Sequence, residues 1–322
     1  MFRLAGAAAA FVLIGAPLVS AQQPDNDIVV VGERLEQVAT HFATEIAAPS
    51  LREDQLARWD ERVCVGMAGL SPDQGQIVVD RISARAAEVG LRVGEPGCRA
   101  NIMVIFTNDS DTVARNIVNE RRDLLGYYGN DAVSTGGREG LEAFANTSRP
   151  IRWWHVARNV TADGRMLDHV NSAPAASASE GASANEAAAS GQPSTGVGSF
   201  SGVQTVRSNG TRTRRTTRQD LNYVLIIVDA ERVSEFPVSA WTDYVAMVSL
   251  AQINAEAEPT AAPSILNLFS SSVENTPMGM TAWDEAYLRG LYRATREATN
   301  TRAQQREISR TIVTTVTVDR PE

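Results

Sequence analysis

The chain contains 322 residues, and a hydrophobic fraction of 43% is sufficient for a sizeable core. Its 38 acidic residues outnumber its 30 basic residues, and the net charge of −8 argues against nucleic acid as a partner. Every basic residue is an arginine. The absence of lysine excludes Schiff-base chemistry on lysine, a Ser-Lys nucleophile pair and the lysine of a phosphate-binding loop.

Residues 1–21 have the pattern of a secretory signal peptide. Arg3 precedes an apolar run, and the segment ends in the small-x-small pattern Val19-Ser20-Ala21. The run is rich in Ala and Gly and contains Pro17, whereas a membrane-spanning helix needs about 20 strongly apolar residues. We therefore expect cleavage of the leader, export to the periplasm or the medium, and no transmembrane segment in the mature chain.

Residues 22–60 are expected to form an N-terminal extension ahead of a single globular domain at 61–322. The β-branched run at residues 27–32 predicts a short strand or a flexible tail. This run also resembles the docking box of TonB-coupled outer-membrane proteins, which implies an accessory role with such receptors. The residues after it are polar and mostly helical in character.

The chain has two cysteines, Cys64 and Cys98. In the oxidising compartment to which a leader directs a protein, a disulfide is the simplest interpretation. Closing this loop contributes about 3 to 4 kcal/mol in the chain-entropy model. The alternative is a catalytic thiol, which needs a nearby histidine, and His41, His155 and His169 are all distant in sequence.

The start of the globular domain predicts a βαβ unit with parallel strands at residues 62–67 and 101–107. A capping box of Ser71 and Gln74 begins the helix between them, and Gly90 supplies its left-handed end. The next helix is expected to be capped by Asp109 or Ser110.

A strand predicted at residues 150–159 contains adjacent tryptophans, Trp153 and Trp154. Neighbouring strand residues face opposite sides of a sheet. One tryptophan should therefore enter the core, and the other should face water, a covering segment or a partner.

Residues 171–202 are almost entirely small and polar, which predicts a disordered insertion that interrupts the domain. The arginines that follow flank a turn at Asn209-Gly210, which favours a solvated hairpin, with contact to an acidic partner as the alternative.

The second half predicts a strand at residues 221–229 whose unbroken apolar run indicates cover on both faces. Helices are expected from about Ser239, from Thr281 and around Ile308, the last running out into a β-branched tail at residues 311–318. These elements predict an α+β or α/β fold, in which helices pack on a mixed sheet with an N-terminal βαβ unit.

No catalytic, cofactor or metal motif is present in the sequence. The zinc motif H-E-x-x-H is absent, and the glycine intervals do not match G-x-G-x-x-G. The nearest approach to G-x-S-x-G, at residues 198–202, has Phe200 in the central position. We therefore assign no catalytic, cofactor-binding or metal-binding residue.

Folding can still bring carboxylates together. Four acids are candidates only in that general sense, and surface or helix-capping duty is the simpler interpretation of each: Asp229, Glu231, Asp243 and Asp284. His155 could act as a base, but a histidine beside large aromatic residues is usually packed or solvated.

Several pieces of the chain resemble a family of exported proteins of Gram-negative bacteria that has no established activity. They are WDERVCVG at 59–66, GEPGCRANI at 94–102, LNLF at 266–269 and MTAWDEAYL at 280–288. The resemblance extends over most of residues 55–315 outside the insertion. It implies an exported protein and no particular reaction.

The layout also resembles that of zincin-like domains, in which a helix after the strand-helix-strand half carries the zinc ligands. Residues 239–253 occupy that place and contain no histidine. The resemblance therefore implies a metal-free relative and argues against peptidase activity.

These observations favour a non-catalytic binding or interaction module of the cell envelope, with a protein or a small molecule as its partner. One alternative is a hydrolase whose acids assemble in a cleft over the sheet. The other is an accessory protein of TonB-linked receptors. A deep pocket lined by buried carboxylates, or by His155 with an acid, would favour catalysis.

Overall fold

The structure is a computed structural model that describes residues 26–49, 54–126, 133–165, 211, 214–271 and 276–318. The predicted leader at 1–21, the insertion at 171–202 and the turn at Asn209-Gly210 lie outside these ranges.

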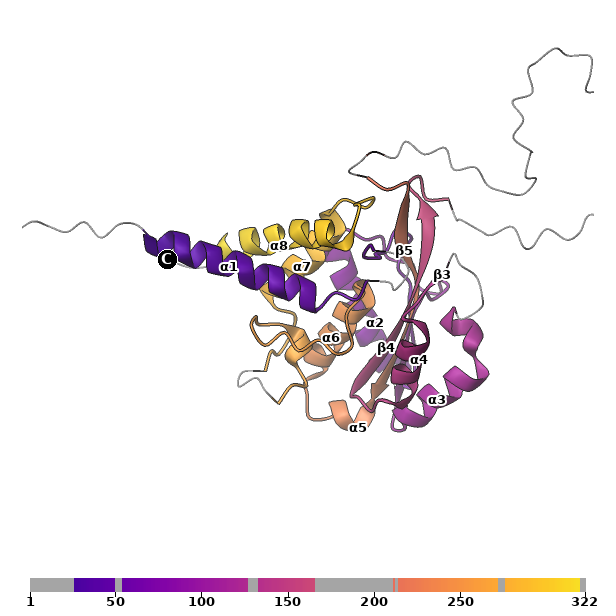
Figure 1. Ribbon diagram of the computed structural model, residues 1–322. Helices are drawn as coiled ribbons and strands as arrows, with labels where there is room; N and C mark the ends of the chain where they lie inside the picture. Colours follow the sequence, from indigo (N-terminus) through magenta and orange to yellow (C-terminus); the bar gives the residue numbers. More distant parts are fainter. Residues whose placement is uncertain are drawn as a thin grey trace, which may run out of the picture.

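A mixed sheet of five strands in the order β1-β2-β5-β4-β3 forms the centre of the described fold (Figure 1). The strands are β1 (Val65–Ala68), β2 (Ile102–Thr107), β3 (Val133–Ser134), β4 (Ile151–Thr161) and β5 (Thr217–Asp229). β1, β2 and β5 are parallel, β4 is antiparallel to β5, and β3 is antiparallel to β4. The mixed sheet and its N-terminal βαβ unit confirm the predicted α+β class.

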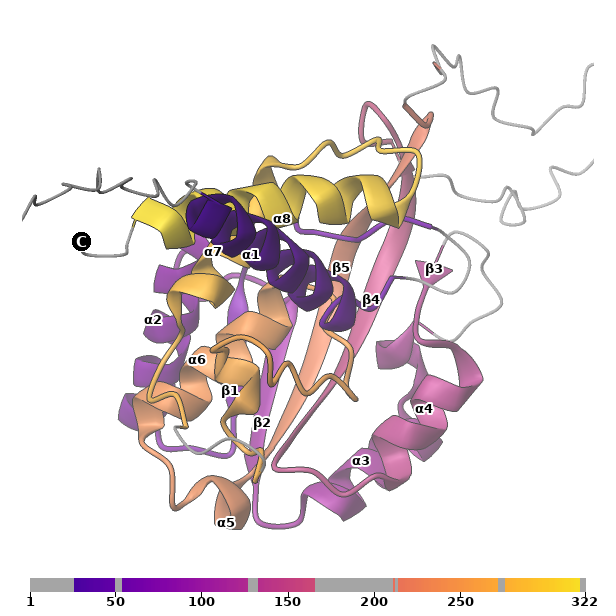
Figure 2. The same ribbon diagram turned by 60° about the vertical axis from the view of Figure 1, so that its left-hand side comes forward.

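Helices cover both faces of the sheet, so the fold has three layers (Figure 2). One face carries α1 (Asn26–Glu45), α2 (Pro72–Glu88), α6 (Val238–Leu250), α7 (Ala282–Arg293) and α8 (Thr301–Val318). The other carries α3 (Ser110–Glu120), the 3-10 turn η1 (Arg122–Leu125) and α4 (Gly137–Asn146). The short α5 (Ala230–Val233) follows β5, and the 3-10 turn η2 (Ile265–Asn267) lies between α6 and α7.

β4 and β5 contribute side chains to a separate hydrophobic cluster on each face. Val224 and Ile226 of β5 pack in the larger cluster, and Leu225 in the smaller one, which confirms that this strand is covered twice. Trp153 packs in the larger cluster and Trp154 in the smaller one. Both indoles are buried, and the covering segments of Trp154 are η1 and α4, so neither faces water.

Local helix signals in the first half act largely as predicted. Gly90 ends α2 in the left-handed conformation with φ 83°, and Asp109 caps α3 by accepting from the Thr112 N–H at 3.1 Å. The predicted capping box before α2 is not formed as expected. The Ser71 hydroxyl donates to the Gln74 side-chain carbonyl at 2.9 Å, so it does not cap a backbone N–H.

The strand or tail predicted at residues 27–32 is wrong, because these residues form the first part of α1. Buried and half-buried apolar residues recur at helical spacing farther along the helix, at Leu35, Val38, Ala39, Phe42 and Ala43, and Ile46 continues the row just past its end. Adding residues to an existing helix costs far less than starting one. The packed part of α1 therefore allows the β-branched residues of 27–32 to extend the helix toward the N-terminus.

The predicted boundary at residue 61 also needs correction, since the preceding segment belongs to the core. Phe42 and Trp59 are buried in the same cluster as the sheet. The Phe42 ring lies edge-on to Trp283 with centroids 5.6 Å apart, and the Trp59 indole donates to the Ser249 carbonyl at 2.9 Å. Residues 34–49 and 54–60 are thus part of the domain, and α1 lies along α8 (Figure 1).

The tail predicted at residues 311–318 is wrong as well, because α8 continues to Val318. The threonine hydroxyls of this stretch donate to carbonyls four residues back, including Thr311 to Glu307 at 3.1 Å and Thr315 to Thr311 at 2.9 Å. These bonds satisfy the hydroxyls inside a helix that Ile312 already anchors.

Within the described ranges, none of the helices has the length and apolar character needed to cross a membrane.

Candidate functional site

A pocket of about 300 Å³ lies along the outer edge of β4. Residues 152–155 of β4 form its floor. One wall comes from α4 and the residues just before it, and the other from residues 252–256 with Ala48 and Pro49. Figure 2 shows α4 beside β4, on the face of the sheet opposite α6.

The pocket exists because β4 is paired on its outer edge over only part of its length. β3 pairs with Ala157 and Arg158 and with no earlier residue of β4. After β3 the chain enters α4, which packs on the face of the sheet instead of extending the ladder. The outer edge of residues 152–155 therefore has no neighbouring strand among the described residues.

The α4 wall is close to Trp154 because two glycines leave room for the indole. A Cβ atom at Gly136 or Gly140 would lie 3.4 or 3.5 Å from the ring. The Phe144 ring lies 6.1 Å from the same indole, between centroids, and the indole N–H donates to the Leu125 carbonyl at 2.9 Å. Trp154 is thus held in one orientation under a largely apolar wall.

The opposite wall is fixed by backbone bonds between two segments far apart in sequence. The Ala48 N–H donates to the Gln252 carbonyl at 3.0 Å, and the Asn254 N–H donates to the Ile46 carbonyl at 2.8 Å. The indole of Trp153 donates to the Ile253 carbonyl at 3.1 Å. These bonds tie the wall to the floor.

Two arginines lie at the end of the pocket where β4 begins. Arg149 donates to the Ala255 carbonyl and pairs with Glu256. Arg152 is only 2% exposed, donates to the Phe144 carbonyl at 3.0 Å and pairs with Asp111. Burial lowers the pKa of Arg152, an effect that the pairing with Asp111 opposes. In the described part of the molecule, the Nε–H of Arg152 has no hydrogen-bond partner.

His155 is buried at the other end of the floor, with Nε2 2.7 Å from the Val248 carbonyl. Burial lowers the pKa of the imidazole to about 4, although the bond to Val248 works in the opposite direction. The ring is therefore neutral at pH 7 and donates to a carbonyl. This placement agrees with the interpretation of His155 as a packed histidine.

The buried imidazole predicts a pH-dependent loss of stability. An unfolded histidine takes up its proton near pH 6.5, and folded His155 does so near pH 4, so the unfolded state binds more protons between these values. Stability should fall by up to about 3 kcal/mol as pH falls through this window. Urea unfolding of the wild type and of His155→Gln, which keeps a donor, measures the difference.

The wild type should lose more stability than His155→Gln between pH 6.5 and pH 4. The variant His41→Gln, at an exposed position on α1, serves as the control and should behave as the wild type does. Parallel curves for the wild type and His155→Gln would show that His155 is not held as a buried neutral ring.

Three of the four candidate acids have the surface or capping roles expected of them. Asp229 accepts from the Arg232 N–H at the start of α5 and from the Ser110 hydroxyl at 2.7 Å, and Glu231 is exposed in the same turn. Asp284 forms a capping box with Thr281 at the start of α7. None of these acids lines the pocket.

Asp243 is an exception, because it is neither a surface residue nor a cap. Its carboxylate has no exposed area and accepts from Arg81 at 2.7 Å, from Arg85 at 2.9 and 3.1 Å, and from the Met280 N–H at 2.8 Å. Burial raises its pKa, but these donors outweigh burial and lower it to about 2. Two features of the sequence could have indicated this cluster. Asp243 is the one charged residue of a largely apolar helix, and Arg81 and Arg85 lie one turn apart on another helix.

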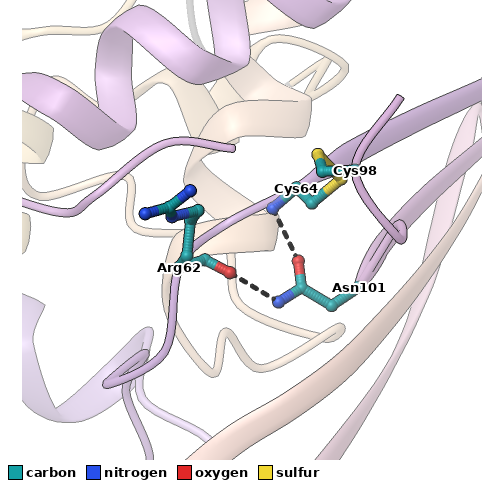
Figure 3. Close-up of a disulfide and its surroundings, with 4 residues drawn as sticks. All are labelled: Arg62, Cys64, Cys98 and Asn101. Carbon is teal, nitrogen blue, oxygen red and sulfur yellow. Dashed lines mark hydrogen bonds between the residues drawn. A yellow bond between two sulfur atoms is a disulfide. The ribbon is translucent and has the colours of Figure 1, made fainter. Parts of the chain in front are cut away.

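The structure confirms the disulfide between Cys64 and Cys98, whose Cα atoms are 6.1 Å apart (Figure 3). Asn101 supports it by accepting from the Cys64 N–H at 2.8 Å and donating to the Arg62 carbonyl at 2.9 Å. Both cysteines of the chain are consumed in this bond, so the catalytic-thiol alternative is wrong.

Across the part of the chain that the structure describes, no group of three or more His, Cys, Asp or Glu side chains is arranged to hold a metal ion. Comparisons of the chain with models of protein families, with curated proteins and with solved structures find no match in any of the three.

Proposed function

We propose that this protein is a non-catalytic binding module of the cell envelope, and that the β4 pocket holds part of its partner. The observation that carries the proposal is the character of the pocket. Its walls are mostly apolar, its arginines are held in ion pairs and its histidine is neutral. A concave, preformed and largely apolar site with a few polar groups is typical of ligand binding.

Export is part of the same proposal and has two supports. Residues 1–21 have the pattern of a signal peptide, and the disulfide between Cys64 and Cys98 is of a kind that persists in oxidising compartments.

The two alternatives have weaker support. Hydrolysis by paired carboxylates needs two acids in one cleft, and Glu256, the one acid among the residues lining the pocket, pairs with Arg149. His155 also lines the pocket, but its ring is bonded to the Val248 carbonyl while Glu256 is bound to Arg149. The TonB-linked role needs an extended segment at residues 27–32, which belong to α1. We therefore base the proposal on neither.

Filling the pocket should abolish capture of the partner without harming the fold. Gly140→Leu places a side chain in the pocket from a position where the Cβ atom makes an ordinary contact with Trp154, and leucine favours a helix more than glycine does. Immobilised mature chain should capture a specific partner from an envelope extract, and Gly140→Leu should reduce that capture at least tenfold at unchanged thermal stability.

Glu139→Leu is the matched control, because it adds the same side chain to the next, exposed position of α4. It should capture the partner as the wild type does. Equal capture by wild type and Gly140→Leu would contradict the proposed site. Turnover of a generic ester, peptide or glycan substrate that Gly140→Leu abolishes would contradict the non-catalytic role.

A further inference from the structure

The backbone along the pocket floor is arranged to accept another strand. In an antiparallel ladder the N–H and C=O groups of successive residues point alternately to the two sides of a strand. The Asp229 N–H donates to the Pro150 carbonyl at 2.9 Å, which sets the phase of β4 against β5. Arg152 and Trp154 therefore bond to β5, and the backbone groups of Trp153 and His155 point to the outer edge.

These outward groups have no hydrogen-bond partner within the described ranges, although both residues are buried. Buried backbone N–H and C=O groups in proteins are almost always paired, with protein, water or ligand. Main-chain bonds from an added peptide strand would pair them, and a pocket beside the strand would hold one of its side chains.

The open edge is short and is closed at both ends. β3 occupies the edge at Ala157 and Arg158. At the other end, the guanidinium of Arg149 reaches across to the Ala255 carbonyl and to Glu256. A groove closed at both ends suits the end of a chain better than a segment that passes through.

The charge of the groove indicates which end of a peptide fits. Arg149, Arg152 and Glu256 are its charged lining residues, and the acid that pairs with Arg152, Asp111, does not line the groove. The Nε–H of Arg152 is buried and has no partner within the structure described here. A free carboxylate is the group that an unpaired guanidinium N–H binds best.

We propose that the groove binds the C-terminal residues of a partner protein, which add to β4 as an antiparallel strand with the terminal carboxylate at Arg149 and Arg152. This inference rests on the proposed binding function and specifies its ligand. The terminal carboxylate lies where β4 begins, so the peptide runs opposite to β4. An apolar side chain of the peptide enters the pocket between the α4 wall and the wall of residues 252–256.

The first test uses peptides. The mature chain, with its disulfide intact, is screened against random heptapeptides that end in a free carboxylate, and the best binder is made as the free acid and as the C-terminal amide. The amide should bind at least tenfold more weakly. Gly140→Leu should lose binding of the free acid, and Glu139→Leu should keep it. Equal binding of acid and amide would overturn the assignment of the carboxylate.

The second test reads the backbone directly by hydrogen exchange in NMR spectra. Bound peptide should slow exchange of the Trp153 and His155 amides at least tenfold. The amides of Arg152 and Trp154, which already face β5, are internal controls and should change little. Peptide binding without this alternation would overturn strand addition, and so would a dimer of the free chain that protects the same amides.

The two proposals can fail separately. If no peptide with a free C-terminus binds, but Gly140→Leu still abolishes capture from the envelope extract, the pocket is a binding site and the peptide inference is wrong. If Gly140→Leu changes neither assay, the binding function assigned to the pocket is wrong as well.

Discussion

Replacement of Asp243 by alanine is expected to lower the free energy of unfolding by about 3 to 5 kcal/mol, the cost of removing one partner from a buried ion pair. The carboxylate has no exposed area and holds Arg81, Arg85 and the Met280 N–H together between α2, α6 and the segment before α7. Its removal leaves Arg85, which is largely buried, without its main acceptor. Urea unfolding at pH 7 measures the loss.

The effect of Asp243 should also depend on pH. Its pKa in the folded protein is about 2, and an unfolded aspartate titrates near 3.9, so the stabilisation is complete above pH 4 and is lost as pH falls toward 2. The difference between wild type and Asp243→Ala should shrink over that window. Asp80→Ala, an exposed acid on α2, is the control and should cost less than about 0.5 kcal/mol. A loss at Asp243 as small as at Asp80 would show that the cluster contributes little.

Removing the disulfide should have the next largest effect. The bond joins residues 34 positions apart, just before the parallel strands β1 and β2. In the chain-entropy model the double variant Cys64→Ser, Cys98→Ser loses about 3 to 4 kcal/mol, because its unfolded chain is less restricted.

Urea unfolding of the double variant should match that of reduced wild type, and adding reductant should leave the double variant unchanged. Identical stability of the oxidised and reduced wild type would contradict a stabilising role for the bond.

Sequence patterns predicted those parts of the fold that local signals determine. Gly90 and Thr281 mark helix ends by their backbone and capping preferences, and the unbroken apolar run of β5 reflects its cover on both faces. The errors concern segments whose structure depends on distant packing. The β-branched residues of 27–32 and 311–318 are helical because α1 and α8 are anchored elsewhere along their length.

The pocket left almost no trace in the sequence. It depends on a β3 strand of two residues that stops short along β4, and on backbone bonds between residues 46–48 and 252–254. Neither feature has a motif, since backbone pairing between distant segments places few demands on side chains. The adjacent tryptophans were the one sequence feature that indicated this region. They predicted a large side chain on each face of β4, and Trp153 and Trp154 do pack on opposite faces.

The most direct test of the binding site is the response of tryptophan indole N–H signals when the partner, captured from an envelope extract, is added to labelled protein. The chain has five tryptophans, of which Trp153 and Trp154 line the pocket, whereas Trp59 is a core residue that does not line it. We expect the indole signals of Trp153 and Trp154 to shift and that of Trp59 to stay unchanged. A partner that binds and shifts neither pocket indole would contradict the site.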